Sequence, residues 1–442
     1  MPVSRLLYRL AQGTLRTLTP VLAPVAARRS PKVARGLRGR RSAHEILAAW
    51  GERHRDPTRP LVWFHAPSVG EGLQARAVLE ALQRRTPELQ SVFTHFSPSA
   101  EGLARRMPAD VAGYLPWDLV GPVRRVLEVV RPDVLAFTKT EVWPVLVEEA
   151  AARDVPAALV AATVPPGAGR LSPAARAFLR PTWRRLRLAA AIAEEDAARL
   201  EELGVPGSAL RVTGDPAIDS AARRVAAADP AEPWLAPFHA DPRPTVVAGS
   251  TWPPDEAVLL PAMDRVREAV QEIRLVVAPH EPEPDHVGGL LADLRERGWR
   301  SGTLAEAEAG GVGGLDAVVV DRVGVLAHLY TVGMAAYVGG GFGDDGLHSV
   351  LEPAAAALPV AFGPRHHNAR AAGDLADDGG GAVTEDADAL ARILTRWFVE
   401  PGARDYAAAR AFGYIDRHRG AADRTAALLR ELLPSPRSTH SP

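Results

Sequence analysis

The chain contains no cysteine, and this absence excludes disulfide bonds, a thiol nucleophile and any metal site with thiolate ligands. It also lacks a run of about 18 consecutive apolar residues, which a membrane-spanning helix would need. A Walker loop and a G-x-S-x-G segment are both missing. The 13 histidines show no metal-binding spacing, because prolines follow His280 and because His366 and His367 are adjacent. We therefore expect neither a metal nor a cofactor.

Acidic residues are missing from residues 1–41, which carry ten Arg or Lys among Leu, Val and Tyr side chains. Since the net charge of the whole chain is −1, the remaining residues carry −11. A segment that is both basic and apolar is typical of peptides that bind anionic lipid headgroups. A transit peptide, or a basic helix packed on its own protein, fits the same composition. The acidic remainder of the chain disfavours nucleic acid as a partner.

Apolar runs and amphipathic stretches alternate from residue 61 to residue 213, and the alternation resumes at residue 245. This rhythm predicts an α/β protein with two Rossmann-like, doubly wound parallel-sheet domains facing across a cleft. The Pro-rich polar stretch between the two halves indicates a linker. The predicted parts are a basic apolar membrane-surface segment 1–41, a domain 42–228, a linker 229–244, a domain 245–434 and a disordered tail 435–442.

Two acidic residues follow predicted strands in the first half. Gly70 and Gly72 are expected to allow a tight turn after the strand ending at His65, which leaves Glu71 in the first turn of the next helix. There Glu71 could act as a base or merely complement the helix dipole. Glu141 follows another strand, and the backbone restriction imposed by Pro144 could aim it into the cleft. Pairing with Lys139 or capping of the next helix is the alternative for Glu141.

In the second half, the backbone N–H groups and hydroxyls of Gly249-Ser250-Thr251 suit a phosphate. A glycine-rich segment at 339–346 formally satisfies G-x-G-x-x-G, but its Asp344 and Asp345 would repel a pyrophosphate. We expect its glycines to let another group approach the backbone closely. We do not expect them to form a dinucleotide site.

The segment that follows the glycines contains further candidates. Ser349 and Glu352 have the spacing of a capping box, which is a structural role. His348 precedes them, beside the glycine-rich turn, and is expected to donate a hydrogen bond to a phosphate or sugar oxygen.

In this order, the segments resemble the Kdo (3-deoxy-D-manno-octulosonic acid) transferase family over most of the chain. The matching residues in the first half are 65–71, 96–101, 115–118, 140–144 and 212–215 with Asp219. Those in the second half are 249–251, 278–281, Asp321 with Gly324, 339–343, Gly346, His348, 351–353 and 363–364 with Asn368. A colinear succession of this length is specific.

The resemblance implies a glycosyltransferase of the GT-B arrangement that moves Kdo from CMP-Kdo to a lipid A precursor in lipopolysaccharide core assembly. It implies a location at the cytoplasmic face of the bacterial inner membrane, peripheral or monotopic, and no divalent metal. Glu71 would be the general base of an inverting transfer. Domain 42–228 would hold the acceptor, with Ser68, Gly70 and Glu141 at the acceptor site or cleft. Domain 245–434 would hold the donor through Ser250, Thr251, His280, Glu281, Gly340, Gly341, His348, Ser349 and Glu352.

The chain also departs from the family pattern. Many members have Arg-His where this chain has His280-Glu281, and Asn where it has Ser349. Ala161 stands in a stretch that is usually Asn-Ala-Arg, and Pro216-Ala217 replace an Arg-bearing segment. These differences leave two alternatives open: a GT-B transferase with another nucleotide sugar or acceptor, and a catalytically silent membrane-surface protein that binds a nucleotide sugar.

Overall fold

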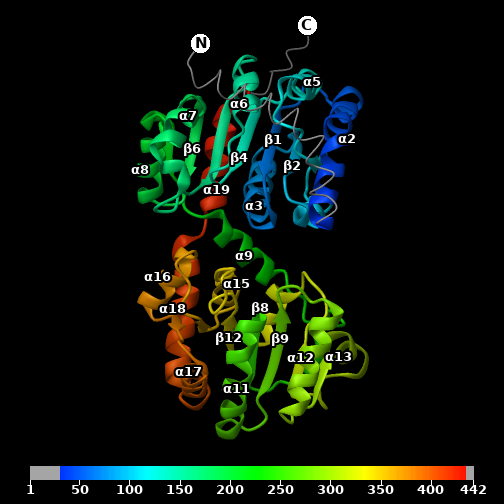
Figure 1. Ribbon diagram of the computed structural model, residues 1–442, viewed down its shortest axis with the longest axis vertical. Coiled ribbons are helices and arrows are strands. Elements are labelled where there is room, and N and C mark those ends of the chain that lie inside the picture. The colour runs from blue at the N-terminus through cyan, green and yellow to red at the C-terminus, as the bar shows by residue number, and fades with distance from the viewer. Residues whose placement is uncertain (1–29, 435–442) are drawn as a thin grey trace. The chain divides into compact units, whose positions relative to one another are not determined.

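A computed structural model describes residues 30–434 of the chain, which divide into two compact units. Unit 1 runs to Ser220 and resumes at Arg419, and unit 2 comprises Ala221–His418. Each unit contains a seven-stranded parallel sheet with helices on both faces (Figure 1). The predicted α/β fold with two doubly wound sheets is therefore confirmed. The predicted segment 1–29 and the predicted tail 435–442 lie outside the described residues.

The sheet of unit 1 has the strand order β3-β2-β1-β4-β5-β6-β7. Its strands are β1 Leu61–Ala66, β2 Gln90–His95, β3 Val111–Tyr114, β4 Val134–Thr138, β5 Ala157–Ala162, β6 Leu186–Ala191 and β7 Leu210–Val212. Its helices are α2 Pro31–His54, α3 Val69–Arg85, α4 Glu101–Ala104, α5 Val120–Val130, α6 Pro144–Ala151, α7 Pro173–Trp183, α8 Glu194–Leu203 and α19 Ala421–Leu432. Helix α9, Pro216–Ala226, contains the boundary between the units.

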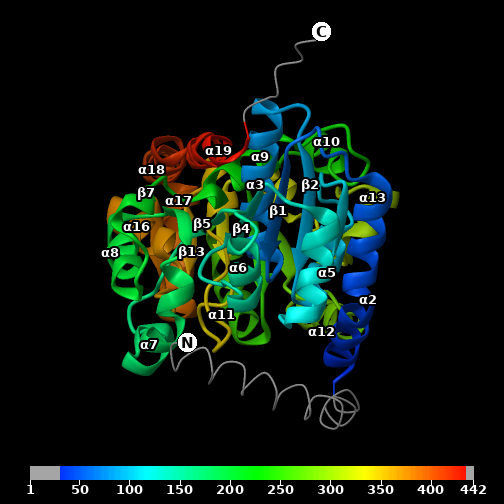
Figure 2. The same cartoon turned by 90° about the horizontal axis from the view of Figure 1, so that it is seen from above.

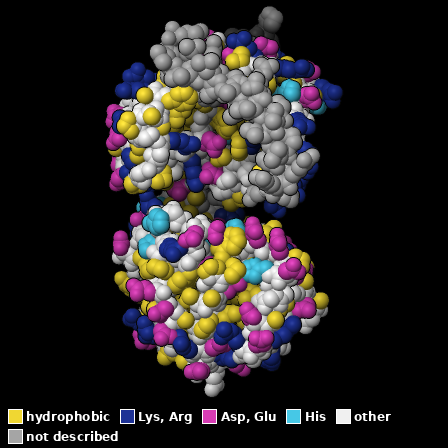
Figure 3. Space-filling model, in the orientation of Figure 1, with side chains coloured by type: hydrophobic (Ala, Val, Ile, Leu, Met, Phe, Trp, Pro, Cys, Tyr) yellow, Lys and Arg dark blue, Asp and Glu magenta, His cyan; other side chains and the backbone are white. Residues whose placement is uncertain are grey.

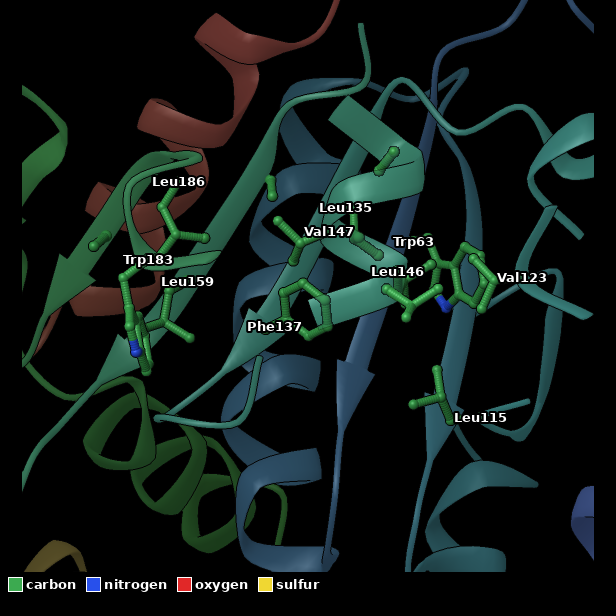
Figure 4. Close-up of a cluster of buried hydrophobic side chains, with 14 of the residues drawn as sticks. Trp63, Leu115, Val123, Leu135, Phe137, Leu146, Val147, Leu159, Trp183 and Leu186 are labelled. Carbon is green, nitrogen blue, oxygen red and sulfur yellow. The ribbon is translucent and has the colours of Figure 1, made fainter. Parts of the chain in front are cut away.

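Alternate residues of β1 supply the two cores of unit 1, as the period of a strand dictates. Leu61 and Trp63 pack with α2, α5, α6, α7 and α8, whereas Val62 and Phe64 pack with α3, α4 and α19. Figure 4 shows Trp63 and Phe137 pointing from their strands into one apolar layer with side chains of α6. Because both sheet faces are covered, the strands read as continuous apolar runs.

The sheet of unit 2 has the order β10-β11-β9-β8-β12-β13-β14. Its strands are β8 Thr245–Thr251, β9 Arg274–Pro279, β10 Ser301–Thr303, β11 Ala317–Val319, β12 Ala335–Val338, β13 Val360–Phe362 and β14 Gly381–Val383. Its helices are α10 Ala236–Ala240, α11 Pro253–Ala269, α12 Pro284–Glu296, α13 Leu304–Gly310, α14 Leu326–Leu329, α15 Leu351–Ala355, α16 Arg370–Asp378, α17 Ala387–Val399 and α18 Pro401–His418. Helices α11, α12 and α17 cover one face of this sheet, and α10, α13 and α14 cover the other (Figures 1 and 2).

Three predicted domain boundaries need correction. The break at residue 41 falls inside α2, a continuous helix that packs on unit 1. The predicted linker 229–244 contains α10, whose Phe238 is buried in the core of unit 2. The predicted second domain, 245–434, includes α19, but α19 packs against α3 of unit 1. In each case an apolar face that needs burial decides which unit the segment joins.

Candidate functional site

The candidate site of unit 1 lies where its strand order reverses, between β1 and β4. Glu71 follows β1, and Lys139 and Glu141 follow β4. These strands pair in parallel, with His65 opposite Phe137, so their carboxyl ends meet at one edge of the sheet. In open α/β sheets, this switch point is where ligands bind.

Glu71 lies in the first turn of α3, as predicted, and its side chain is 16% exposed. Its Oε1 lies 3.1 Å from the Lys139 Nζ, and its Oε2 accepts a hydrogen bond from the Ser68 hydroxyl. Lys139 is one of only two lysines in the chain and adopts a left-handed φ of 60°. Backbone strain of this kind clusters at functional sites. Glu141, the carboxylate that the alternative interpretation pairs with Lys139, is thus not its partner: Lys139 pairs with Glu71.

The two glycines beside Glu71 do not form the predicted tight turn. Gly70 and Gly72 both lie inside α3, and neither has a left-handed φ. A Cβ at Gly72 would collide with Leu103, so this glycine allows α4 to pack on α3. A Cβ at Gly70 would meet nothing within 4 Å, which leaves open space next to Glu71.

Glu141 is half-buried, and burial raises its pKa above the usual value. The charge of Arg170 opposes this rise most, and Arg40 opposes it too, while the Glu71 carboxylate adds to it. The structure therefore brings Glu71 and Glu141 into one electrostatic environment. Arg170 and Arg40 belong to the same environment, and the sequence singled out neither for this site.

Arg40 reaches the site from α2. Its side chain is buried, its guanidinium lies 3.2 Å from the centre of the Phe96 ring, and its Nη2 donates to the Phe96 carbonyl oxygen at 2.8 Å. The Phe96 ring stacks in turn on Trp143, just before α6. Burial lowers the pKa of Arg40 to about 10, so it stays a cation at neutral pH. Residue 40 therefore packs on its own protein, as one of the interpretations of the basic segment predicts.

A buried histidine, His65, supports Trp143 next to this site. The Trp143 Nε1 donates to the His65 Nε2 at 3.2 Å, and the His65 Nδ1 lies 3.1 Å from the Thr94 hydroxyl. His65 is fully buried, and desolvation lowers its pKa to about 3. The ring is therefore neutral, with Nε2 as acceptor and Nδ1 as donor. This arrangement fixes Trp143 and hence the segment that carries Glu141.

The candidate site of unit 2 also lies at a reversal of strand order, between β8 and β12. Ser250 is the last residue but one of β8 and has a left-handed φ of 56°. Thr251 is buried, and its hydroxyl donates to the Glu256 Oε1 at 2.8 Å. Since a hydroxyl has one proton, Thr251 cannot also donate to a phosphate in this arrangement. Of the two predicted hydroxyl donors, the geometry leaves Ser250.

The glycine-rich loop after β12 contacts its own chain. A Cβ at Gly340 would collide with the Gly346 carbonyl, and one at Gly341 with Gly363. The Gly340 N–H donates to the Asp255 Oδ2 at 2.8 Å. The close approach predicted for these glycines is therefore to the protein backbone, and the amide of Gly340 is bonded to a buried carboxylate.

Asp255, which the sequence did not single out, binds the amides of this loop. It is fully buried and also accepts hydrogen bonds from the Tyr337 hydroxyl and from the Phe342 and Trp252 amides. Trp252 is the N-cap of α11, and Asp255 follows it by three residues. This is the capping-box spacing, which could have identified Asp255 from the sequence.

The start of α11 offers no amide for a phosphate. Pro253 and Pro254 have no N–H group, and the amides of Asp255 and Glu256 both donate to the Trp252 carbonyl oxygen. The first turn of α11 therefore adds no free amide to the site predicted after β8, and side chains beside it are further candidates for donors.

Three aromatic rings supply such side chains. The ring planes of Trp252 and His348 are 25° from parallel, and the Trp252 Nε1 donates to the His348 Nε2 at 3.0 Å. The exposed His280 stacks on both, with ring centres 4.8 Å from Trp252 and 4.2 Å from His348. Burial, aided by the charge of His280, lowers the pKa of His348 to about 4.

The remaining residues predicted to bind the sugar donor are Glu352 and Ser349, which contact each other, and Glu281. Glu352 is buried, accepts a hydrogen bond from the Ser349 hydroxyl at 2.5 Å and forms an ion pair with Arg224 of α9. The N-cap of α15 is Val350, so Ser349 and Glu352 do not form the predicted capping box. Glu281 is exposed directly after His280. Within residues 30–434, no three His, Asp or Glu side chains are grouped so that they could hold a metal ion.

The whole fold has relatives among solved structures. It matches the putative UDP-N-acetylglucosamine 2-epimerase of Listeria monocytogenes with a TM-score of 0.59 and 14% identity, over 84% of this chain and 96% of that one. It matches the UDP-GlcNAc 2-epimerase of Neisseria meningitidis with a TM-score of 0.57 and 13% identity, over 85% and 99% of the two chains. Together with the two sheets, these likenesses define a protein of the GT-B fold class.

Sequence comparison is more specific than the fold. Residues 43–220 match the model of the family described as 3-deoxy-D-manno-octulosonic-acid transferase (kdotransferase). The transferase of Bordetella pertussis is 28% identical over 87% of this chain and 90% of its own length, and that of Haemophilus influenzae is 25% identical over 84% and 87%. These comparisons support the resemblance to the Kdo transferase family that the motifs indicate, and with it a glycosyltransferase.

Proposed function

We propose that this glycosyltransferase moves Kdo from CMP-Kdo to a hydroxyl of a lipid A precursor with inversion at the anomeric carbon. The observation that carries the proposal is Glu71, at the switch point of the unit 1 sheet, in a chain whose curated relatives are named 3-deoxy-D-manno-octulosonic acid transferases. Its carboxylate accepts a hydrogen bond from the Ser68 hydroxyl, which an incoming hydroxyl can replace, and pairs with the half-exposed Lys139.

In the proposed reaction, Glu71 accepts the proton of the acceptor hydroxyl while that oxygen forms its bond to the anomeric carbon. The bond from that carbon to the phosphate oxygen breaks, and CMP leaves with the electron pair. The acceptor hydroxyl takes the place of Ser68 as the donor to Glu71. Lys139 stays beside the carboxylate and holds it in position until the proton arrives.

Unit 2 is proposed to bind the donor. Ser250 and His348 are the side chains that can donate to its phosphate, and His280 covers the ring layer behind them. Glu352 would accept from ribose hydroxyls after exchanging Ser349 or Arg224 for the ligand. No divalent metal is needed for one departing phosphate, because hydrogen-bond donors can meet its charge.

The proposed acceptor and the basic segment together support action at an anionic membrane surface. Arg35, Arg38 and Arg41 of α2 are exposed, whereas Arg40 is buried. Among residues 30–434, no helix is both long enough and apolar enough to cross a membrane. Exposed cations at the start of α2 favour a surface-bound protein of the inner membrane. Figure 3 shows acidic and basic side chains interspersed on the drawn face of unit 2. The start of α2, by contrast, carries basic side chains only.

The test combines product analysis with one conservative substitution. Purified protein is mixed with candidate CMP-linked sugars and a lipid A precursor, and the products are weighed by mass spectrometry. We expect Glu71→Gln to fold and to bind CMP but to lower the transfer rate by roughly 10²–10⁴-fold, the usual contribution of a general base. Glu80→Gln, on the same helix α3, is the matched control and keeps the rate.

Each other outcome points to a different function. Equal rates for Glu71→Gln and the wild type remove the assigned base. Product with another nucleotide sugar shows a GT-B transferase of different specificity. CMP binding without transfer of any sugar shows the catalytically silent protein.

A further inference from the structure

Several backbone amides at the candidate phosphate site of unit 2 are already engaged. The first two residues of α11 are prolines, and the next two amides are bonded to the Trp252 carbonyl. The Gly340 amide of the neighbouring loop is bonded to Asp255. Side-chain N–H and O–H groups are therefore candidates for donors to a phosphate at this edge of the sheet.

His348 can donate to a ligand while it accepts from Trp252 only in one tautomer of its neutral ring. A neutral imidazole carries its proton on either Nδ1 or Nε2, and the other nitrogen is then an acceptor. The Trp252 Nε1 is a donor only, and it lies 3.0 Å from the His348 Nε2. That nitrogen must therefore be bare, and the proton must reside on Nδ1.

The stack keeps the two rings in this geometry. The ring planes of Trp252 and His348 are 25° from parallel, with ring centres 6.4 Å apart, and the Trp252 N–H reaches the His348 Nε2. His280 lies on both rings, at 33° to Trp252 and 18° to His348. The two charged or titratable groups that act on the His348 ring are His280, which disfavours its cation, and Asp345, which favours it. Since burial outweighs Asp345, the pKa of His348 is low, at about 4, and the ring stays neutral near pH 7.

We infer that Trp252 is a positioning residue of the donor site: its indole N–H fixes His348 as the Nδ1–H tautomer and thereby makes it a neutral hydrogen-bond donor for an oxygen of the nucleotide sugar. The inference rests on the proposed function in one respect, because it takes the donor to bind at His348. The tautomer itself is a property of the protein without substrate.

The test of the tautomer uses the full chain labelled with ¹⁵N-histidine and needs no substrate. Long-range ¹H–¹⁵N spectra distinguish a protonated from a bare ring nitrogen, and His348→Gln assigns the signals. We expect wild-type His348 to show a protonated Nδ1 and a bare, hydrogen-bonded Nε2. Trp252→Phe keeps an aromatic ring under His280 but removes the N–H, so the two ¹⁵N shifts of His348 should move toward each other as the tautomers mix.

A matched control comes from the same unit. Trp234 also stacks on a histidine, His328, with ring centres 5.7 Å apart. Trp234→Phe should leave the His348 shifts at their wild-type values. A wild-type spectrum with a protonated Nε2, or unchanged His348 shifts in Trp252→Phe, overturns the inference.

CMP binding measured by calorimetry separates this inference from the proposed function. If Trp252 acts through His348, Trp252→Phe and His348→Gln should each weaken CMP binding about tenfold, the value of one hydrogen bond, and the double variant should lose little more. Altered shifts in Trp252→Phe with unchanged CMP affinity in His348→Gln support the tautomer assignment and reject the placement of the donor.

Discussion

At the scale of single residues, the candidate base is defined by its partners. Glu71 combines a position in the first turn of α3 with an ion pair to Lys139, whose left-handed backbone brings its ammonium to the carboxylate. The pair is partly exposed, so it contributes little to stability.

The Lys139 ammonium should affect the rate of transfer. Its Nζ lies 3.1 Å from the Glu71 Oε1 and can hold the carboxylate in position. In Lys139→Met, kcat/KM should therefore fall by about tenfold, the value of one charge-assisted hydrogen bond, and Lys139→Arg should restore most of it. Steady-state rates provide the measurement. An unchanged kcat/KM in Lys139→Met would show that this ammonium does not position the Glu71 carboxylate.

His65 predicts a loss of stability in acid. Its pKa is lowered by burial from 6.5 to about 3, so the unfolded chain takes up the proton first as the pH falls. The stability of unit 1 is unaffected by this group above pH 6.5 and decreases progressively from there toward pH 3. Between pH 7 and pH 5 the loss from His65 is about 2 kcal/mol.

Denaturant unfolding of unit 1 at the two pH values measures this loss. His65→Gln should be less stable at pH 7, since it disturbs the bonds to Thr94 and Trp143, but should lose less stability on acidification. The exposed His367→Gln is the control and should keep the wild-type slope. Equal slopes for all three proteins would exclude His65 as a source of acid sensitivity.

At the scale of secondary-structure elements, α2 has a packed face and an exposed basic face. Arg40 packs on Phe96 within unit 1, and exposed arginines flank it along the helix. Deleting residues 1–41, the cut that the composition suggests, would therefore remove a packed part of unit 1. Substitutions on the exposed face avoid this damage.

Binding to vesicles tests the exposed face. Replacing Arg35, Arg38 and Arg41 together by Gln should weaken binding to vesicles of anionic lipid by roughly a hundredfold, at about 1 kcal/mol for each cation near the surface, and leave CMP binding unchanged. Co-sedimentation at low and at physiological salt provides the measurement. Arg392, Arg396 and Arg404, replaced together in unit 2, provide a charge-matched control. Equal weakening by both triple variants would show that α2 is not the docking element.

At the scale of the whole molecule, α19 follows unit 2 in the sequence but belongs to the core of unit 1. Ala422, Ala426 and Leu429 of α19 are buried in the core that α3 forms, and the Asp219 carboxylate accepts hydrogen bonds from the Gly420 and Ala422 amides. Unit 1 is therefore discontinuous in sequence.

Truncation tests this organisation. A chain that ends at His418 should lose on the order of 5 kcal/mol from the stability of unit 1, because it exposes the apolar face of α3, and should leave unit 2 unchanged. Scanning calorimetry combined with hydrogen exchange assigns the transitions to the units. A chain that ends at Pro434 is the control. If both truncated chains unfold like the full protein, α19 is not part of the unit 1 core.

The sequence by itself determined the α/β class, most strands and the place of Glu71, because these depend on local apolar periodicity and on the rule that loops after parallel strands meet at one edge. Apolar runs do not mark β3, β10 and β14, which are short strands at the sheet edges. Tertiary structure alone decided that Lys139 pairs with Glu71, that Asp255 binds the amide of Gly340, and that α19 belongs to unit 1. Each of these depends on contacts between residues far apart in the chain, and no local pattern encodes which partner a charged or apolar side chain will meet.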